Sequence, residues 1–240
     1  MTKTRICVWS GPRNISTALM YSFANRTDTR VIDEPFYAHY LNSTGVTHPG
    51  REEVLASQEI DAGKVIDQVV LKDYDEPILF IKNMAHHLTE MRTDFLDKLI
   101  NVFLIRDPEE VITSLIKNLP EPVMRDTGFK MEYEIFESLQ AKGLKPLVID
   151  AHELLKDPEK ILKAFCQKVD ISFEWQMLSW NKGPRPEDGV WAKYWYENVH
   201  NSTGFAPYCP KNRLVPPALN GLLESCQHYY DLLYREAIKA

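Results

Sequence analysis

Two short segments of this chain combine tight turns with arginine and hydroxyl side chains, the groups that proteins use to bind anions. The first segment is Ser10-Gly11-Pro12-Arg13-Asn14-Ile15-Ser16-Thr17, and the second begins with Arg106-Asp107-Pro108 and includes Ser114. An arginine can direct two N–H bonds at a phosphate, and the N–H groups at the start of a helix attract the same charge. Two such segments in one chain predict a ligand that is phosphorylated at both ends.

Each anion-binding segment follows an apolar run and precedes a helical pattern. The two runs are Ile6-Cys7-Val8-Trp9 and Val102-Phe103-Leu104-Ile105. A strand, a loop and a helix in this order aim backbone N–H groups and the positive end of the helix dipole at a bound anion. The elements around the two segments therefore support the same interpretation as their side chains.

Strand-like runs alternate with helical patterns along the whole chain. The expected strands are Arg5–Trp9, Thr29–Asp33, Ile78–Lys82, Asn101–Ile105 and Pro146–Asp150. The expected helices are Ser16–Asn25, Pro108–Leu119, Met131–Lys142, Asp157–Val169 and one that begins at Ala218. The strands are almost continuously apolar, which suits a parallel sheet covered on both faces. We therefore expect residues 1–240 to form a single three-layer α/β domain with a central parallel sheet.

One long segment, Ser172–Pro217, has no regular hydrophobic period and is rich in tryptophan, tyrosine, proline and glycine. Irregular segments of this length are uncommon in compact domains and usually have a function. Its aromatic side chains could form the wall of an acceptor site, although aromatic residues serve a core equally well.

The composition excludes several classes of protein. A net charge of −6 is unlike that of general nucleic-acid-binding proteins, and no apolar run approaches the roughly 20 residues that span a bilayer. The N-terminus does not resemble a signal peptide, and the four cysteines are scattered. We expect a cytoplasmic protein with reduced thiols and without nucleic-acid or membrane partners, which could pair with a second copy of itself.

The first anion-binding segment lacks the Gly-Lys pair of a Walker A loop. It resembles the 5′-phosphosulfate loop of sulfotransferases, which use 3′-phosphoadenosine 5′-phosphosulfate (PAPS) and have a P-loop NTPase-like fold. The resemblance implies that Arg13 contacts the sulfuryl group and its bridging oxygen. It also implies that Ser16 and Thr17 hold the 5′-phosphate. The remaining residues of the implied loop are Pro12, Asn14 and Ile15, and Ile15 replaces the usual glycine. A capped helix start with an exposed arginine is the alternative.

Two later segments also resemble parts of these enzymes. Leu104-Ile105-Arg106-Asp107-Pro108, with Ser114 eight residues after the arginine, is similar to their 3′-phosphate motif. The resemblance implies that Arg106 and Ser114 hold the 3′-phosphate. Asn181-Lys182-Gly183-Pro184-Arg185 resembles the late basic loop that closes over the same phosphate, which implies roles for Lys182 and Gly183. A solvated basic turn is the alternative for this third segment.

The general base has two sets of candidates. Glu34 follows the second expected strand and resembles the base of bacterial carbohydrate-type sulfotransferases. We expect it to lie beside the first loop, and we favour it. Lys82, followed by His86 and His87, resembles the Lys-x-His of cytosolic sulfotransferases, in which lysine assists and histidine is the base. The two histidines are displaced from that spacing. Surface carboxylates and packed histidines are the structural alternatives.

Together these motifs predict an enzyme that transfers a sulfuryl group from PAPS to a hydroxyl or amine of a small-molecule acceptor. The cations expected to neutralise the donor without a metal are Arg13, Lys82, Arg106 and Lys182. A nucleotide or small-molecule kinase with the same fold is one alternative. A homologue that binds nucleotide without a working base is another. The sequence does not identify the acceptor.

Overall fold

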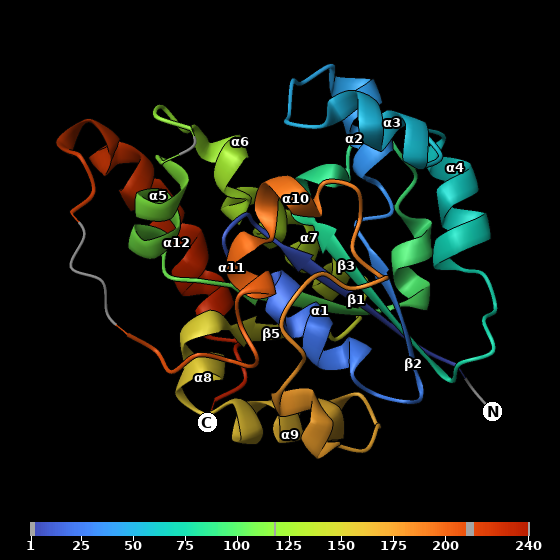
Figure 1. The fold of residues 1–240 in the computed structure, drawn as a ribbon. Helices are drawn as coiled ribbons and strands as arrows, with labels where there is room; N and C mark the ends of the chain where they lie inside the picture. The colour runs from blue at the N-terminus through green and yellow to red at the C-terminus, as the bar shows by residue number, and fades with distance from the viewer. Residues whose placement is uncertain (1–2, 118, 210–213, 240) are drawn as a thin grey trace.

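The computed structural model describes residues 3–117, 119–209 and 214–239. A parallel sheet of five strands in the order β2-β3-β1-β4-β5 lies at its centre (Figure 1). The strands are β1 (Thr4–Ser10), β2 (Thr29–Asp33), β3 (Ile78–Met84), β4 (Ile100–Ile105) and β5 (Leu147–Asp150). The expected sheet is confirmed, with strand bounds that differ from the predicted ones by no more than a few residues.

Side chains of each strand alternate between two hydrophobic cores, one on each face of the sheet. In β1, Ile6 and Val8 pack on one face, whereas Cys7 and Trp9 pack on the other. The first core includes α1 (Ser16–Ala24) and α9 (Pro158–Lys168). The second includes α7 (Phe129–Ala141) and the end of α12 (Asn220–Tyr234). This two-sided burial explains why the strands read as continuous apolar runs, and it makes the domain three-layered.

The other helices are short and lie mostly near the carboxyl ends of the strands. They are α2 (Tyr37–Thr44), α3 (Arg51–Ser57), α4 (Ala62–Val65), α5 (Pro108–Leu115), α6 (Met124–Thr127), α8 (Ala151–Lys156), α10 (Ala192–Trp195) and α11 (Glu197–His200). Within its described residues, the segment expected to be irregular therefore contains the single-turn helices α10 and α11 and a 3-10 turn at Trp175–Leu178. No helix in the described part of the chain is long and apolar enough to cross a membrane.

The order of the strands creates a crevice between β1 and β4. The chain leaves β1 towards β2 at one edge of the sheet and later leaves β4 towards β5 at the other edge. Ligands of α/β proteins bind where the loops diverge in this way. The same order corrects one expectation: β3 lies between β1 and β2, so the neighbour of Glu34 is Lys82 rather than the first loop. The Glu34 N–H donates to the Lys82 carbonyl oxygen over 2.8 Å.

Candidate functional site

A cavity of about 1580 Å³ extends along the carboxyl ends of the strands. Residues that follow each of the five strands contribute to its wall, as do parts of the segment 191–209. Members of these groups are Arg13 after β1, Glu34 after β2, His86 after β3, Arg106 after β4 and His152 after β5. Both expected anion-binding segments and the favoured base therefore face one continuous space.

The first anion-binding loop connects β1 to α1 with an unusual backbone. Arg13 and Ile15 have φ angles of 69° and 58°, in the left-handed region. Ile15 precedes the first turn of α1, and its side chain makes no capping hydrogen bond to the helix N–H groups. A branched side chain in this conformation costs roughly 1–2 kcal/mol, which glycine would avoid. The loop thus holds local strain beside the first-turn N–H groups of α1, as functional sites often do.

The second segment begins α5 and brings a second arginine to the first loop. Asp107 caps this helix by accepting the Glu110 N–H over 3.1 Å, and Pro108 occupies its first position. Arg106 Nη1 donates to the carbonyl oxygen of Arg13 over 2.9 Å, and Arg106 Nε donates to Glu110 Oε2 over 2.6 Å. The two segments are therefore in direct contact.

Arg13 and Ser114 also meet, because Arg13 Nε donates to Ser114 Oγ over 2.9 Å. The pKa of Arg13 is lowered, first by burial and then by the charge of Arg106. Two like charges held close together at a cavity favour the arrival of an anion, which would relieve their repulsion. The structure thus brings Arg13, Arg106 and Ser114 together at the wall of the cavity.

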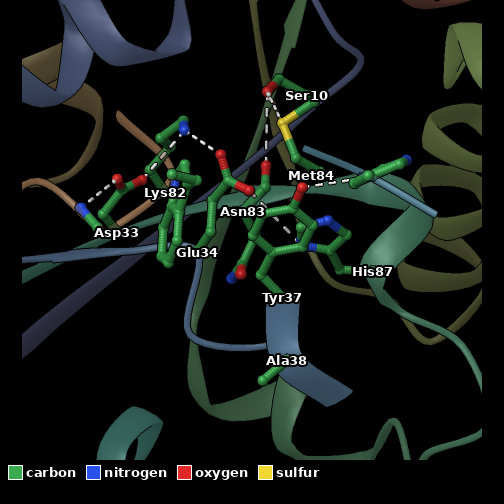
Figure 2. A network of polar contacts seen from close by, with 12 residues as sticks. Ser10, Asp33, Glu34, Tyr37, Ala38, Lys82, Asn83, Met84 and His87 are labelled. Carbon is green, nitrogen blue, oxygen red and sulfur yellow. Dashed lines mark hydrogen bonds and ion pairs between the residues drawn. The ribbon is translucent and has the colours of Figure 1, made fainter. Parts of the chain in front are cut away.

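A buried cluster of charges lies at the β2–β3 side of the cavity, and Figure 2 shows it from close by. The Lys82 ammonium donates to Asp33 Oδ1 over 3.1 Å, to Glu34 Oε1, and to the Tyr196 hydroxyl over 2.6 Å. The Lys82 residue is only 2% exposed. Asp33 also accepts the Tyr196 hydroxyl over 2.8 Å. Two carboxylates therefore share one ammonium, and Glu34 reaches the cavity from this cluster.

The charge states of this cluster follow from burial and from pairing. Burial raises the pKa of Glu34, and the charge of Lys82 opposes that rise. Burial alone would lower the pKa of Lys82, but Asp33 and Glu34 raise it above its ordinary value. Lys82 is consequently a cation at neutral pH, and Glu34 is a carboxylate with more affinity for a proton than an exposed one.

The two histidines of the competing motif occupy different places. His86 lines the cavity, whereas His87 lies behind it, stacked between Tyr37 and Tyr40 at ring-centroid distances of 4.8 and 4.9 Å. Burial lowers the pKa of His86 to about 3 and that of His87 well below its ordinary value. Both rings are therefore neutral at pH 7. His87 Nδ1 lies 3.9 Å from Glu34 Oε2.

Aromatic side chains form the cavity wall next to Glu34. They are Tyr37, Tyr40, His48, Trp191, Tyr194, Trp195 and Tyr196. Trp191 Nε1 donates to the Tyr196 hydroxyl over 3.0 Å, which fixes the ring that contacts Lys82. Sequence reasoning did not identify Tyr196 as a site residue. The available signal was the density of aromatic residues around positions 191–196.

The third predicted segment lies elsewhere. Lys182 and Gly183 do not line the cavity, and the Gly183 N–H donates to the His200 carbonyl oxygen over 2.8 Å. Arg185 contacts the Ala24 carbonyl oxygen over 3.1 Å, at the C-terminal end of α1. The first loop is at the N-terminal end of the same helix. The length of α1 therefore separates this segment from the paired arginines, and the structure does not bring Lys182 and Gly183 to them.

The cavity continues past Arg106 to the β5 side. His152 and Leu155 of α8 line it there, together with residues 204–209 of the long aromatic segment. The rings of His152 and Tyr208 are 4.1 Å apart between centroids. This end is lined by aromatic and apolar side chains next to the second anion-binding segment, which suits a nucleotide base.

Comparisons with known proteins agree with this architecture. A family model described as a sulfotransferase domain matches residues 4–237. The sulfotransferase domain of the Synechococcus PCC 7002 olefin synthase is 15% identical, with a TM-score of 0.58 over 93% of this chain and 94% of that one. The sulfotransferase domain from the curacin biosynthetic pathway is 17% identical, with a TM-score of 0.57 over 99% of both chains. These similarities show the fold.

Two curated relatives come from Arabidopsis thaliana, the branched-chain-amino-acid aminotransferase-like proteins 1 and 2. They are 39% and 38% identical to this chain over 94% and 95% of its length. The chain spans only 40% and 41% of the length of these relatives.

Proposed function

Because this chain belongs to the sulfotransferase domain family, we propose that it transfers a sulfuryl group from PAPS to a hydroxyl or amine of a small-molecule acceptor. The observation that carries the proposal is the meeting of Arg13, Arg106 and Ser114 at the crevice between β1 and β4. A donor with phosphate groups at both ends supplies the anions that two arginines held side by side require.

In this proposal the loop Pro12–Thr17 holds the 5′-phosphosulfate with its backbone N–H groups and the hydroxyls of Ser16 and Thr17. Arg106 and Ser114 hold the 3′-phosphate. The nucleotide base lies towards His152 and residues 204–209, where aromatic and apolar side chains line the cavity. Lys182 and Gly183 have no part in this site, because they lie outside the cavity.

Transfer is an in-line displacement at sulfur. The acceptor oxygen or nitrogen forms a bond to sulfur while the bond from sulfur to the 5′-phosphate oxygen breaks. The acceptor proton passes to the Glu34 carboxylate, and the electron pair of the broken bond stays on the bridging oxygen. Arg13 stabilises the charge that develops there. The products are the sulfated acceptor and 3′-phosphoadenosine 5′-phosphate (PAP).

Lys82 and His87 support Glu34 in this scheme. Lys82 holds the carboxylate in place and keeps part of its charge compensated, so that it stays ionised in a buried setting. His87 packs as a neutral ring next to Glu34, stacked on Tyr37 and Tyr40. Both residues act through Glu34 and not on the acceptor itself.

Donor binding tests the proposal without knowledge of the acceptor. Calorimetry should show PAP binding at least about ten-fold more tightly than AMP, which lacks the 3′-phosphate, because a hydrogen bond to a charged group contributes roughly 1.5–3 kcal/mol. Arg106→Ala should abolish most of this preference. Arg92→Ala is the matched control, since Arg92 pairs with Asp67 and Asp94 outside the cavity. Equal affinity of the wild-type protein for PAP and AMP would contradict the proposal.

Turnover tests the reaction itself. Incubation with PAPS carrying radiolabelled sulfate and a panel of hydroxyl and amine acceptors should give a labelled product and PAP in equal amounts. Magnesium-dependent turnover of ATP in place of PAPS would favour a kinase. Tight binding of PAP without transfer to any acceptor would favour a homologue that only binds nucleotide.

A further inference from the structure

A buried acid lies beneath the first anion-binding loop and takes no part in the proposed reaction. Glu132, in the first turn of α7, is 0% exposed. Its Oε1 accepts the backbone N–H of Gly11 over 2.7 Å. Its Oε2 has no hydrogen-bond partner among the described residues. The Glu132 side chain is therefore held to the loop by a single backbone hydrogen bond.

The loop and the start of α7 also touch backbone to backbone. A Cβ on Gly11 would lie 2.3 Å from the Thr127 carbonyl oxygen. A Cβ on Gly128, whose φ is 85°, would lie 2.7 Å from Gly11 Cα. Only glycine at both positions permits this approach. The junction of α6 and α7 is consequently in direct contact with Gly11, which lies at the start of the loop.

The loop needs support from outside itself. Arg13 and Ile15 both adopt left-handed conformations, which persist only where the surrounding structure enforces them. The hydrogen bond to Glu132 fixes the loop where it leaves β1. Asn14 Nδ2 fixes it from the side by donating to the Leu104 carbonyl oxygen over 2.9 Å. Glu132 is the contribution of α7 to this support.

The charge state of Glu132 matters because its neighbour is an anion-binding loop. Burial raises the pKa of Glu132 well above its ordinary value of 4.5, and the Gly11 N–H opposes that rise only in part. A neutral acid can accept the N–H bond without repelling a phosphate. An ionised carboxylate in the same place would weaken anion binding.

We propose that Glu132 is a positioning residue for the donor: its carboxyl oxygen anchors the Gly11 N–H and thereby sets the place of the loop Pro12–Thr17. The close approach of Gly11 to the Thr127 carbonyl oxygen also couples that loop to α6, whose Arg125 and Asp126 line the cavity. The identity of the donor in this proposal rests on the proposed function. The anchoring of Gly11 by Glu132 is independent of that function.

Three variants separate positioning from simple stability. Glu132→Gln keeps the shape, the accepting oxygen and the absence of charge. Glu132→Leu removes the acceptor and leaves the Gly11 N–H without its partner. Leu139→Ala is the matched control, because Leu139 is a fully buried residue of the same helix that packs in the second hydrophobic core. Hydrogen exchange at the Gly11 amide reports the anchor, thermal unfolding reports stability, and calorimetry with PAP reports the donor site.

We expect Glu132→Gln to protect the Gly11 amide and to bind PAP within about two-fold of the wild-type protein. Glu132→Leu should expose the amide and weaken PAP binding by about ten-fold, the effect of one lost hydrogen bond. Leu139→Ala should lower the unfolding temperature while it leaves both other readings unchanged. A folded Glu132→Leu protein with normal exchange and affinity would overturn the proposal, as would a Gln variant as impaired as the Leu variant or one with markedly tighter PAP binding.

The two proposals fail in different ways. If the wild-type protein does not prefer PAP to AMP, the donor assignment fails, and the exchange measurements still test the anchor. If the preference holds and the Gly11 amide exchanges equally in all variants, the anchor fails and the donor assignment stands.

Discussion

Glu34 combines three properties that a general base requires. It reaches the cavity, its pKa is raised by burial, and Lys82 keeps it in a fixed position. Its φ of 40° turns the chain sharply at the end of β2, which leads directly into α2. A neutral His86 at the same cavity has a much lower affinity for protons, because burial lowers its pKa to about 3.

Replacement of Glu34 by Gln should therefore remove turnover and leave donor binding intact. Loss of a general base lowers the rate by roughly 10²–10⁴-fold, whereas the amide keeps the shape of the side chain. Sulfate transfer and calorimetry with PAP measure the two effects separately. His86→Ala and His87→Ala should have smaller effects on turnover. Loss of transfer in a histidine variant together with an active Glu34→Gln protein would assign the base to that histidine.

The pH profile of transfer distinguishes the same candidates. A carboxylate base is active when ionised, so the activity should fall as the pH decreases through the raised pKa of Glu34. A His86 base would keep its activity down to the neighbourhood of its pKa of about 3. The residual activity of the Glu34→Gln variant should no longer fall as the pH decreases through this range. If the activity of that variant still fell with decreasing pH in the same range, a group other than Glu34 would be responsible for the pH dependence.

Residues in contiguous motifs could be predicted from the sequence, and those joined by long-range contacts could not. Arg13, Arg106 and Ser114 belong to short sequence motifs that can be recognised without knowledge of the fold. Tyr196 contacts Lys82 across 114 positions, and Glu132 contacts Gly11 across 121 positions. Neither Tyr196 nor Glu132 lies in a motif, so only the fold reveals their partners.

At the scale of elements, α7 links stability to pH through Glu132. Below its ordinary pKa of 4.5 the side chain is protonated in both the folded and the unfolded chain. Above that value the unfolded chain releases the proton while the folded protein keeps it. The folded state then binds more protons, so this group makes stability decrease as the pH rises towards the raised pKa.

The variant Glu132→Gln lacks this dependence and should become more stable relative to the wild-type protein as the pH rises from about 5 to about 8. Urea unfolding of both proteins across that range measures the difference in free energy. Glu134→Gln, on the same helix and at an exposed carboxylate that pairs with Lys130, is the control. A constant difference between wild type and Glu132→Gln at all pH values would show that Glu132 is ionised in the folded protein.

The strands and long helices could be predicted from the spacing of their apolar residues, and the bounds Thr29–Asp33 match β2 in full. The short helices were not predicted, since they gain their stability from packing rather than from their own pattern; they are α2, α3, α4, α6, α8, α10 and α11. The order of the strands could not be predicted either. The three inner strands, β3, β1 and β4, are buried on both faces, so their sequences do not show which strand lies next to which.

At the scale of the whole molecule, the cavity is large enough for two ligands. Its volume of about 1580 Å³ exceeds the roughly 300–1,000 Å³ of an ordinary single-ligand pocket. Both anion-binding segments and Glu34 open into it. Donor and acceptor can therefore be bound together, which direct transfer between them requires.

Initial rates should accordingly show a sequential mechanism. Double-reciprocal plots against donor concentration at several acceptor concentrations should intersect, because a complex with both substrates forms before transfer. PAP should compete with PAPS and not with the acceptor. Parallel lines would instead indicate a covalent sulfated intermediate, which has no place in direct transfer to the acceptor.

With the strand order β2-β3-β1-β4-β5, different segments of the chain contact the two proposed substrates. In the proposed function, contacts to the donor come from the loops after β1 and β4 and from His152 and residues 204–209, whereas the aromatic wall near Glu34 comes from residues 37–48 and 191–196. Mutations that alter the wall need not disturb the nucleotide site. A lineage built on this scaffold can therefore exchange one acceptor for another by small changes in two segments, while it inherits the chemistry of the donor unchanged.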